Sequence, residues 1–180
     1  EKVPALIEDV VGFSVQRRLT PCFYVSPLTS PESFASLLTE RGFVLYDQMM
    51  VLELVEKPYQ PKDSGLRIVE AKEGTVAIWA ESFLQAFNLP DTWRPEVFRR
   101  ASSVASVKEA TLLLGYLNER PVGTVALYSK EKVGGIYCLG VVGAHRGKGL
   151  ASALICQAIL KSREGGNETI CLQTLDQDRL

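Results

Sequence analysis

A glycine-spaced basic segment, residues 144–149 (AHRGKG), leads directly into an apolar run. If that run is a helix, about four of its first backbone N–H groups lack intrahelical partners, and the helix dipole adds partial positive charge there. Gly147 and Gly149 would let a ligand approach the backbone closely. Arg146 and Lys148 add positive charge. The segment therefore suits a phosphate group, although an ordinary strand-to-helix connection with a solvated basic turn explains the spacing equally well.

A strand before this segment and a helix after it would position these residues. Residues 134–142 (GGIYCLGVV) are apolar with aromatic and β-branched members, which is typical of a strand. The following helix is expected to end near Glu164. Its buried face is predicted from apolar residues at helical spacing: Ala151, Leu154, Ile155, Ala158 and Ile159.

The pattern of residues 66–175, which include this segment, predicts a mixed fold. Strands are expected at 66–71, 111–118, 122–129 and 168–175, and helices at 75–88 and 92–106. Asp91 is the predicted cap of the second helix. The short connections on either side of 122–129 predict an antiparallel meander. The order is strand, two helices, three antiparallel strands, helix and strand, which indicates an α+β class.

The first part of the chain predicts its own set of elements. These are a helix at 3–19, a strand at 22–26, a helix at 29–43 and one or two strands at 44–55. Ser30 is the predicted N-cap of the second helix, Pro31 its first residue and Gly42 its end. Residues 56–65 contain two prolines, charges and a Ser-Gly pair, so we predict a linker and a domain boundary there.

Composition narrows the classes of partner. Apolar residues make up 46% of the chain and charged residues 23%, as expected of a soluble globular protein. The net charge of −1 provides no basic field, so nucleic acid is not an expected partner. No apolar run approaches the ~20 residues of a membrane span, and the N-terminus shows no signal-peptide pattern. We therefore expect no membrane partner.

The four cysteines occur in apolar contexts, none forms a CxxC pair, and the chain has one histidine. This pattern predicts no metal site. It favours buried thiols in a reducing, cytoplasmic environment.

The loop and the element order together resemble the GNAT family of acyl-CoA-dependent N-acyltransferases. The family motif is Arg or Gln, two residues, Gly, one residue, then Gly or Ala, and Arg146, Gly149 and Ala151 fill these places. Residues 118–128 (NERPVGTVALY) are similar to the family's second-to-third strand hairpin. The resemblance covers residues 66–175. It implies the GNAT fold, a mixed and mostly antiparallel central sheet flanked by helices.

Residues 23–54 are similar to the last third of a GNAT domain. The resemblance implies a degenerate GNAT-like half at 1–58, as in tandem members, followed by an acetyltransferase domain at 66–180. An unrelated αβα extension is the alternative for the first half. The family continues beyond the strand at 168–175 with a helix and a hairpin. The end of the domain is therefore expected to be incomplete, unless the strands at 44–55 fill the empty sheet positions.

The resemblance implies acetyl-CoA as co-substrate, with its pyrophosphate at the loop and its pantetheine arm along the preceding strand edge. The implied binding residues are Leu139, Gly140, Val141, Arg146, Gly147, Lys148, Gly149, Leu150 and Ala151. Gly140 would suit a bulge or a close ligand approach. An N–H group of the same strand would stabilise negative charge on the thioester oxygen.

The catalytic base and acid are not evident. Some family members carry a Glu at a position that matches about Gly135 here, and the family's usual acid is a Tyr in the missing final helix. A base acting through water, Glu131 or Asp176, is a hypothesis without a motif behind it. Three other residues are interpreted as structural or solvated: Tyr116, Tyr137 and His145.

The implied reaction is direct attack of a neutral amine on the thioester, with catalysis mainly by positioning. In the family the acceptor groove lies between the first two helices and the sheet. Trp79, Phe83 and Phe87 share a helical face that we interpret as core, whereas Trp93 is free to line a cleft. Because no acidic run is present, we expect a small-molecule or amino-acid-like amine as acceptor. The resemblance also leaves room for a homodimer.

Three other interpretations of the loop differ in how well they fit. A non-catalytic CoA-binding sensor or scaffold on the same frame stays open. A dinucleotide fold would use GKGLAS and Asp176, but Ser152 replaces its third glycine and antiparallel strands precede it. A P-loop fails because Gly143 lies one residue too close and Gly149 stands where Ser or Thr should follow Lys148.

Overall fold

The computed structural model describes residues 2–55 and 64–175 of the 180-residue chain. The chain forms two compact units that divide between Gln48 and Met49. Of the predicted linker at 56–65, residues 56–63 lie outside the described residues.

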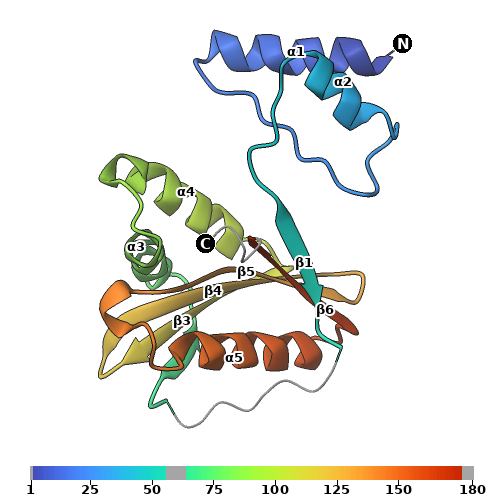
Figure 1. Cartoon of the computed structure of the whole chain (residues 1–180). Coiled ribbons are helices and arrows are strands. Elements are labelled where there is room, and N and C mark those ends of the chain that lie inside the picture. The colour runs from blue at the N-terminus through green and yellow to red at the C-terminus, as the bar shows by residue number, and fades with distance from the viewer. Residues whose placement is uncertain (1, 56–63, 176–180) are drawn as a thin grey trace. The chain divides into compact units, whose positions relative to one another are not determined.

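The second unit contains one six-stranded sheet in the order β1-β6-β5-β4-β3-β2 (Figure 1). Its strands are β1 (Met49–Glu53), β2 (Arg67–Glu70), β3 (Ala110–Leu117), β4 (Arg120–Lys130), β5 (Val133–Val141) and β6 (Thr169–Leu175). Every neighbouring pair is antiparallel except β5 and β6, which are parallel. The predicted α+β class, with a mixed and mostly antiparallel sheet and a β3-β4-β5 meander, is confirmed.

Helices cover both faces of this sheet (Figure 1). Helices α3 (Val76–Ala86) and α4 (Arg94–Ala105) pack on one face, and α5 (Leu150–Glu164) packs on the other. Asp91 does not cap α4 as predicted. Residues Asp91–Trp93 form a short 3₁₀ turn, and the Asp91 carboxylate accepts a hydrogen bond from Arg94 at 2.8 Å.

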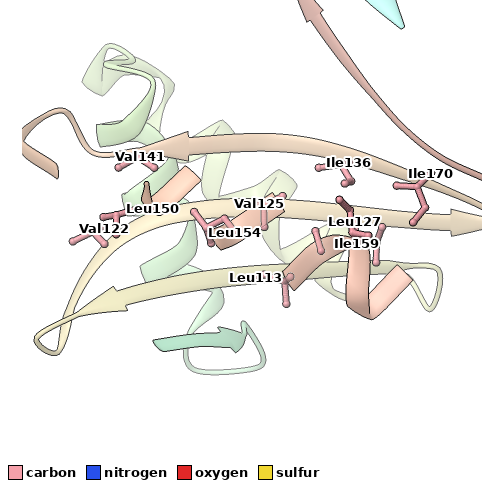
Figure 2. Close-up of a cluster of buried hydrophobic side chains, with 11 residues drawn as sticks. Leu113, Val122, Val125, Leu127, Ile136, Val141, Leu150, Leu154, Ile159 and Ile170 are labelled. Carbon is pink, nitrogen blue, oxygen red and sulfur yellow. The ribbon is translucent and has the colours of Figure 1, made fainter. Parts of the chain in front are cut away.

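The larger core lies between α5 and the sheet (Figure 2). Alternate residues of a strand point to the same face, so Val125 and Leu127 of β4 both reach this layer. Leu113 of β3 lies opposite Val125 in the strand register and joins them. Leu154, in the first half of α5, is fully buried among these side chains. The predicted apolar face of this helix is confirmed.

A buried polar cluster joins the C-terminal end of α5 to the end of β4. The side-chain amide of Asn167 donates to the hydroxyls of Ser162 at 3.0 Å and Ser129 at 2.8 Å. Gly134 lies against this cluster, because a Cβ atom placed on it would be 2.0 Å from Oγ of Ser162. The cluster leaves no room for a side chain at this position of β5.

We expect Gly134→Ala to lower the free energy of unfolding by about 1–3 kcal/mol, because the new methyl group displaces Ser162 and strains its buried hydrogen bond. Urea denaturation followed by circular dichroism measures this loss. Gly143→Ala is the control, since no atom lies within 4 Å of the position that its new methyl group would take. Equal unfolding midpoints for the two variants would contradict this account of the cluster.

The first unit contains two helices, α1 (Lys2–Gln16) and α2 (Phe34–Glu40). The ring of Phe23 packs edge-on against the rings of Phe34 and Phe43, with centroid distances of 5.8 and 5.2 Å. The predicted strand at 22–26 is wrong. A strand needs a neighbour for its backbone groups, and no strand is present between residues 2 and 48.

The predicted start of the second helix is also wrong, whereas its end is confirmed. Ser30 and Pro31 precede the helix, and Ser33 is the residue before its first turn. Gly42 follows the last turn with a φ of 82°, a conformation that glycine adopts without strain. The structure leaves the idea of a degenerate GNAT-like half at 1–58 as a prediction.

The predicted strands at 44–55 reduce to β1. It pairs with β6 in antiparallel register, from Met49 opposite Leu175 to Glu53 opposite Cys171. This strand therefore extends the sheet of the second unit beyond β6. That this stretch fills the sheet positions left empty by the family's final elements stays a prediction.

Candidate functional site

Strands β5 and β6 pair only along their first halves. The parallel register runs from Val133 opposite Thr169 to Ile136 opposite Leu172. Beyond Ile136, β5 continues to Val141, while β6 continues alongside β1, and the two strands diverge (Figure 1). Within the described chain, this edge of β5 has no strand partner after Ile136. Backbone N–H and C=O groups on such an edge can pair with an extended ligand.

The half of β5 that has no partner on the β6 side, called the unpaired half below, contains a bulge in its pairing with β4. Gly140 lies opposite Thr124 and Tyr137 opposite Ala126, so Cys138 and Leu139 together face one residue of β4. Cys138 has a φ of 53°, and its carbonyl oxygen accepts a hydrogen bond from the Thr124 hydroxyl at 3.0 Å. A bulge bends its strand and redirects the backbone groups near it.

The sequence predicts that Gly140 suits either a bulge or a close ligand approach, and the bulge lies instead at Cys138 and Leu139. The absence of a side chain at Gly140 allows the end of α3 to approach the β5 backbone closely. A Cβ atom on Gly140 would lie 2.7 Å from Cε2 of Phe87 and 2.9 Å from Cβ of Ala86. The end of α3 thus crosses β5 at a position that only glycine can occupy without displacement.

The loop after β5 presents backbone groups to open space. A 3₁₀ turn at Gly143–His145 leads to Gly147 and Gly149, whose φ angles are 73° and 77°. No atom lies within 4 Å of a Cβ position on either glycine. Helix α5 begins at Leu150, so the N–H groups of its first turn lie next to this open surface. The predicted strand, loop and helix start are confirmed.

The structure gathers the predicted binding residues at one end of the sheet. Leu139, Gly140 and Val141 end β5, the loop carries the basic residues and glycines, and α5 begins immediately afterwards. The side chain of Leu150 is buried in the core, so this residue can offer only its backbone to a ligand. Lys148 is exposed.

The guanidinium of Arg146 is directed toward the protein. Its Nε donates to the carbonyl oxygen of Val141 at 3.0 Å, and an Nη donates to the carbonyl oxygen of Ala86 at 2.7 Å. Arg146 therefore shapes the loop through contacts with β5 and α3. Sequence reasoning missed this role, because Ala86 precedes Arg146 by 60 residues.

The structure argues against one proposed catalytic residue. Glu131 lies in the turn before β5, at the opposite end of that strand from the loop. At about 3.3 Å per strand residue, it is too far from the bulge to act through one water molecule. Asp176 lies outside the described residues. Gly135 is covered by the ring of Tyr137, since a Cβ atom there would lie 2.6 Å from that ring.

The three residues interpreted as structural or solvated have different surroundings. Tyr116 is structural: the Arg67 guanidinium lies 4.7 Å from its ring centroid. Tyr137 lies on the strand face, where burial, followed by the nearby Cys171 and Tyr128, raises the pKa of its hydroxyl above the usual value. The prediction of a solvated His145 is wrong, because its Nδ1 is buried and has no hydrogen-bond partner in the described part of the chain.

Aromatic residues extend from the smaller core, which lies between the sheet and helices α3 and α4, to the part of β5 beyond Ile136. The indole N–H of Trp79 donates to the carbonyl oxygen of Leu113 at 3.0 Å. The indole also stacks on the ring of Phe83, with a distance of 5.4 Å between the ring centroids. The rings of Phe83 and Phe87 are in contact, with a distance of 4.6 Å between their centroids. The predicted core role is confirmed for Trp79 but is wrong for Phe87, which is 43% exposed beside Gly140. A glycine in the strand was the available signal for this close approach.

The corner between α3 and α4 carries an exposed aromatic residue and paired charges. Trp93 is 56% exposed, in keeping with its predicted freedom. Arg94 forms ion pairs with both Glu81 and Asp91. On α4, hydrogen bonds from Arg99 and Arg100 lower the pKa of Glu96 to about 2. These carboxylates all have cationic partners.

Two further features concern metals and membranes. Among the described residues, no group of three or more His, Cys, Asp or Glu side chains is placed to hold a metal ion. The absence of a metal cofactor stays a prediction. No helix in the described part of the chain is both long and apolar enough to cross a bilayer.

Three solved structures show the same fold over about 60% of this chain. A putative acetyltransferase from Pyrococcus horikoshii is 21% identical with a TM-score of 0.53, over 62% of this chain and 39% of its own. A predicted acetyltransferase from Clostridium acetobutylicum, solved with acetyl-CoA, is 14% identical with a TM-score of 0.52, over 63% and 84%. AAC(6')-Iy, solved with a CoA bisubstrate analogue, is 12% identical with a TM-score of 0.55, over 63% and 82%.

This chain thus spans about two fifths of the length of the Pyrococcus protein. No curated protein sequence matches it. The model of the acetyltransferase (GNAT) family matches residues 73–179, more than half of the chain, and includes β5, the loop and α5. The chain belongs to the acetyltransferase (GNAT) family.

Proposed function

We propose that this protein is an acetyl-CoA-dependent N-acetyltransferase. The observation that carries the proposal is that the unpaired edge of β5 ends at the open loop around Gly147 and Gly149. Acetyl-CoA is an extended molecule with a pyrophosphate, an amide-bearing arm and a terminal thioester. The start of α5 suits the pyrophosphate, and the β5 edge suits the amides of the arm.

The chemistry follows from this placement. The neutral amine attacks the thioester carbon, the new C–N bond forms, the C–S bond breaks, and the proton lost by the amine balances the departing thiolate. The products are an N-acetylated amine and CoA. Backbone N–H groups near the bulge at Cys138 and Leu139 would stabilise the negative charge on the thioester oxygen. The base and the acid remain unassigned, so positioning is the proposed source of rate enhancement.

A small-molecule or amino-acid-like amine is the proposed acceptor. Phe87 and Trp93 offer exposed aromatic surface, whereas the carboxylates of the α3–α4 corner are paired with arginines and would not hold a polycationic tail. One protein of similar fold is an aminoglycoside acetyltransferase from a soil metagenomic sample, which is 22% identical. A cytoplasmic location and a homodimer also stay predictions.

Thermal shift with CoA, NAD and ATP tests the ligand class. A ligand at 100 times its dissociation constant stabilises the folded state by about 2.7 kcal/mol, so we expect CoA to raise Tm and the two nucleotides to leave it unchanged. Release of free CoA thiol from acetyl-CoA with a panel of amines then tests catalysis. Binding without release for any amine would favour the non-catalytic sensor. A shift with NAD or ATP alone would contradict the proposal.

For the acceptor, we expect Trp93→Ala to raise KM three- to tenfold, about 1 kcal/mol, because the exposed indole would lose its contact with the amine. Steady-state kinetics at saturating acetyl-CoA measures this change, and CoA affinity should stay within twofold of the wild type. Val104→Ala, at an exposed apolar residue of α4, should change neither value. Equal losses of acceptor and CoA binding in Trp93→Ala would mark Trp93 as a structural residue.

A further inference from the structure

The last turn of α3 has a backbone carbonyl that no N–H group of its own helix end satisfies. Asn88 has a φ of 50°, and its N–H donates to the carbonyl oxygen of Gln85 at 3.3 Å. The N–H of Leu89 donates to the carbonyl oxygen of Leu84 at 3.0 Å. This pair of bonds forms a Schellman motif, which is a common helix ending. It provides no hydrogen-bond donor for the carbonyl oxygen of Ala86. Because Ala86 is 2% exposed, water has little access to that oxygen.

Arg146 supplies the missing partner from the loop after β5. One Nη donates to the carbonyl oxygen of Ala86 at 2.7 Å, while Nε donates to that of Val141 at 3.0 Å. The planar guanidinium can span two acceptors in a fixed geometry, which a lysine ammonium cannot do. Its positive charge also lies at the C-terminal end of a helix, where a cation is stabilised.

A second contact joins the same three segments. At Gly140, β5 comes so close to α3 that a Cβ atom would lie 2.7 Å from the ring of Phe87. The end of α3, the end of β5 and the loop therefore meet at one junction. Directly after this junction the chain turns through residues 88–93, which end at the exposed Trp93.

We propose that Arg146 is a positioning residue that couples the CoA loop to the α3–α4 corner. The proposal rests on the proposed function. CoA on the loop fixes the backbone that carries Arg146, and Arg146 fixes the end of α3, so that CoA binding orders the segment bearing Phe87 and Trp93. The same coupling acts in reverse, because an acceptor that orders this corner must tighten CoA binding by the same factor.

The two basic residues of the loop give a matched pair of variants. Arg146→Lys keeps the positive charge but loses the double contact with Val141 and Ala86. Lys148→Ala removes an exposed charge from the loop and leaves the junction intact. If Lys148 binds phosphate and Arg146 couples the loop to the corner, Lys148→Ala should weaken CoA binding, whereas Arg146→Lys should abolish the response of the corner to CoA.

Acrylamide quenching of Trp93 fluorescence reports the order of the corner. The chain has two tryptophans, so Trp79→Phe is introduced as the background in which Trp93 is the single emitter. In this background, saturating CoA should lower the quenching constant at least twofold. Lys148→Ala should weaken CoA binding but keep this response at saturation. Arg146→Lys should bind CoA within about threefold, lose the response, and raise the acceptor KM five- to tenfold at saturating acetyl-CoA.

Arg146→Gln, which keeps one amide donor, is measured in parallel in case Arg146→Lys does not fold, and should also lose the response. A CoA-dependent quenching change that persists in either folded Arg146 variant would overturn the proposal. So would weakened CoA affinity with an unchanged acceptor KM, which would mark Arg146 as a phosphate ligand. Failure of the wild-type chain to bind CoA would instead contradict the proposed function, and the coupling with it.

Discussion

Gly149→Glu should weaken CoA binding more than 100-fold in isothermal titration calorimetry. The residue lies directly before α5, and no atom is within 4 Å of the position that a Cβ would take, so the new side chain enters the proposed pyrophosphate site without a clash. Its carboxylate repels the pyrophosphate and competes for the same N–H groups. The helix dipole favours that carboxylate, so the fold should lose only the roughly 1–2 kcal/mol associated with the φ of 77°.

Gly149→Asn is the matched control. Asparagine tolerates positive φ and carries no charge, so this variant should share most of the backbone cost but bind CoA within about tenfold of the wild type. Similar CoA affinities for the two variants would remove electrostatic repulsion as the cause. Wild-type affinity in Gly149→Glu would show that the pyrophosphate binds elsewhere.

Leu154→Ala should lower the free energy of unfolding by about 2–5 kcal/mol, because truncation leaves a cavity in a packed core. The side chain is 0% exposed and lies at the centre of the cluster between α5 and the sheet (Figure 2). Its methyl groups lie close above two strand glycines: Cβ positions on Gly115 and Gly123 would be 3.3 and 2.7 Å away. The backbone beneath cannot easily fill the cavity, because these strands are held by their ladders.

Chemical denaturation of Leu154→Ala and Leu160→Ala separates burial from helix propensity. Leu160 lies on the same helix but is 52% exposed, so its truncation should cost no more than about 0.5 kcal/mol. A comparable loss in both variants would mean that α5 is stabilised along its whole length and not through this core.

The local parts of the site were predictable because their signals are short in sequence. Gly147 and Gly149 need positive φ angles, and the apolar period from Ala151 onward is that of a helix, so the loop and the start of α5 follow from about 20 residues. The β3-β4-β5 meander was predictable for the same reason, since its connections are too short for crossovers.

The features that sequence did not predict depend on distant partners. The pairing of β1 with β6 joins Glu53 to Cys171, and the contact of Arg146 with Ala86 spans 60 residues. The bulge at Cys138 arises from the fit of β5 to β4, which no local pattern records. Residues 22–26 have the composition of a strand but find no strand partner, so tertiary context overrides their propensity.

The environment of Phe87 was predictable from the local sequence only in part. Its helical spacing with Trp79 and Phe83 indicated core, and two of the three rings are indeed packed inward. The third lies where α3 ends over Gly140, and 43% of its surface is exposed to solvent. Periodicity identified the face of the helix, but the exposure of its last aromatic residue depends on the tertiary packing of the end of α3.

The most direct measurement is the change in backbone amide NMR shifts when CoA is added to the full chain. If CoA binds along the unpaired half of β5 and at the start of α5, the largest shifts at saturation will be those of Gly147, Gly149 and Ala151 in the loop and first turn, together with Leu139 and Gly140 on the strand. Saturating CoA that leaves the amides of Gly147 and Gly149 unmoved, or that shifts only residues 1–48, would contradict the proposed site.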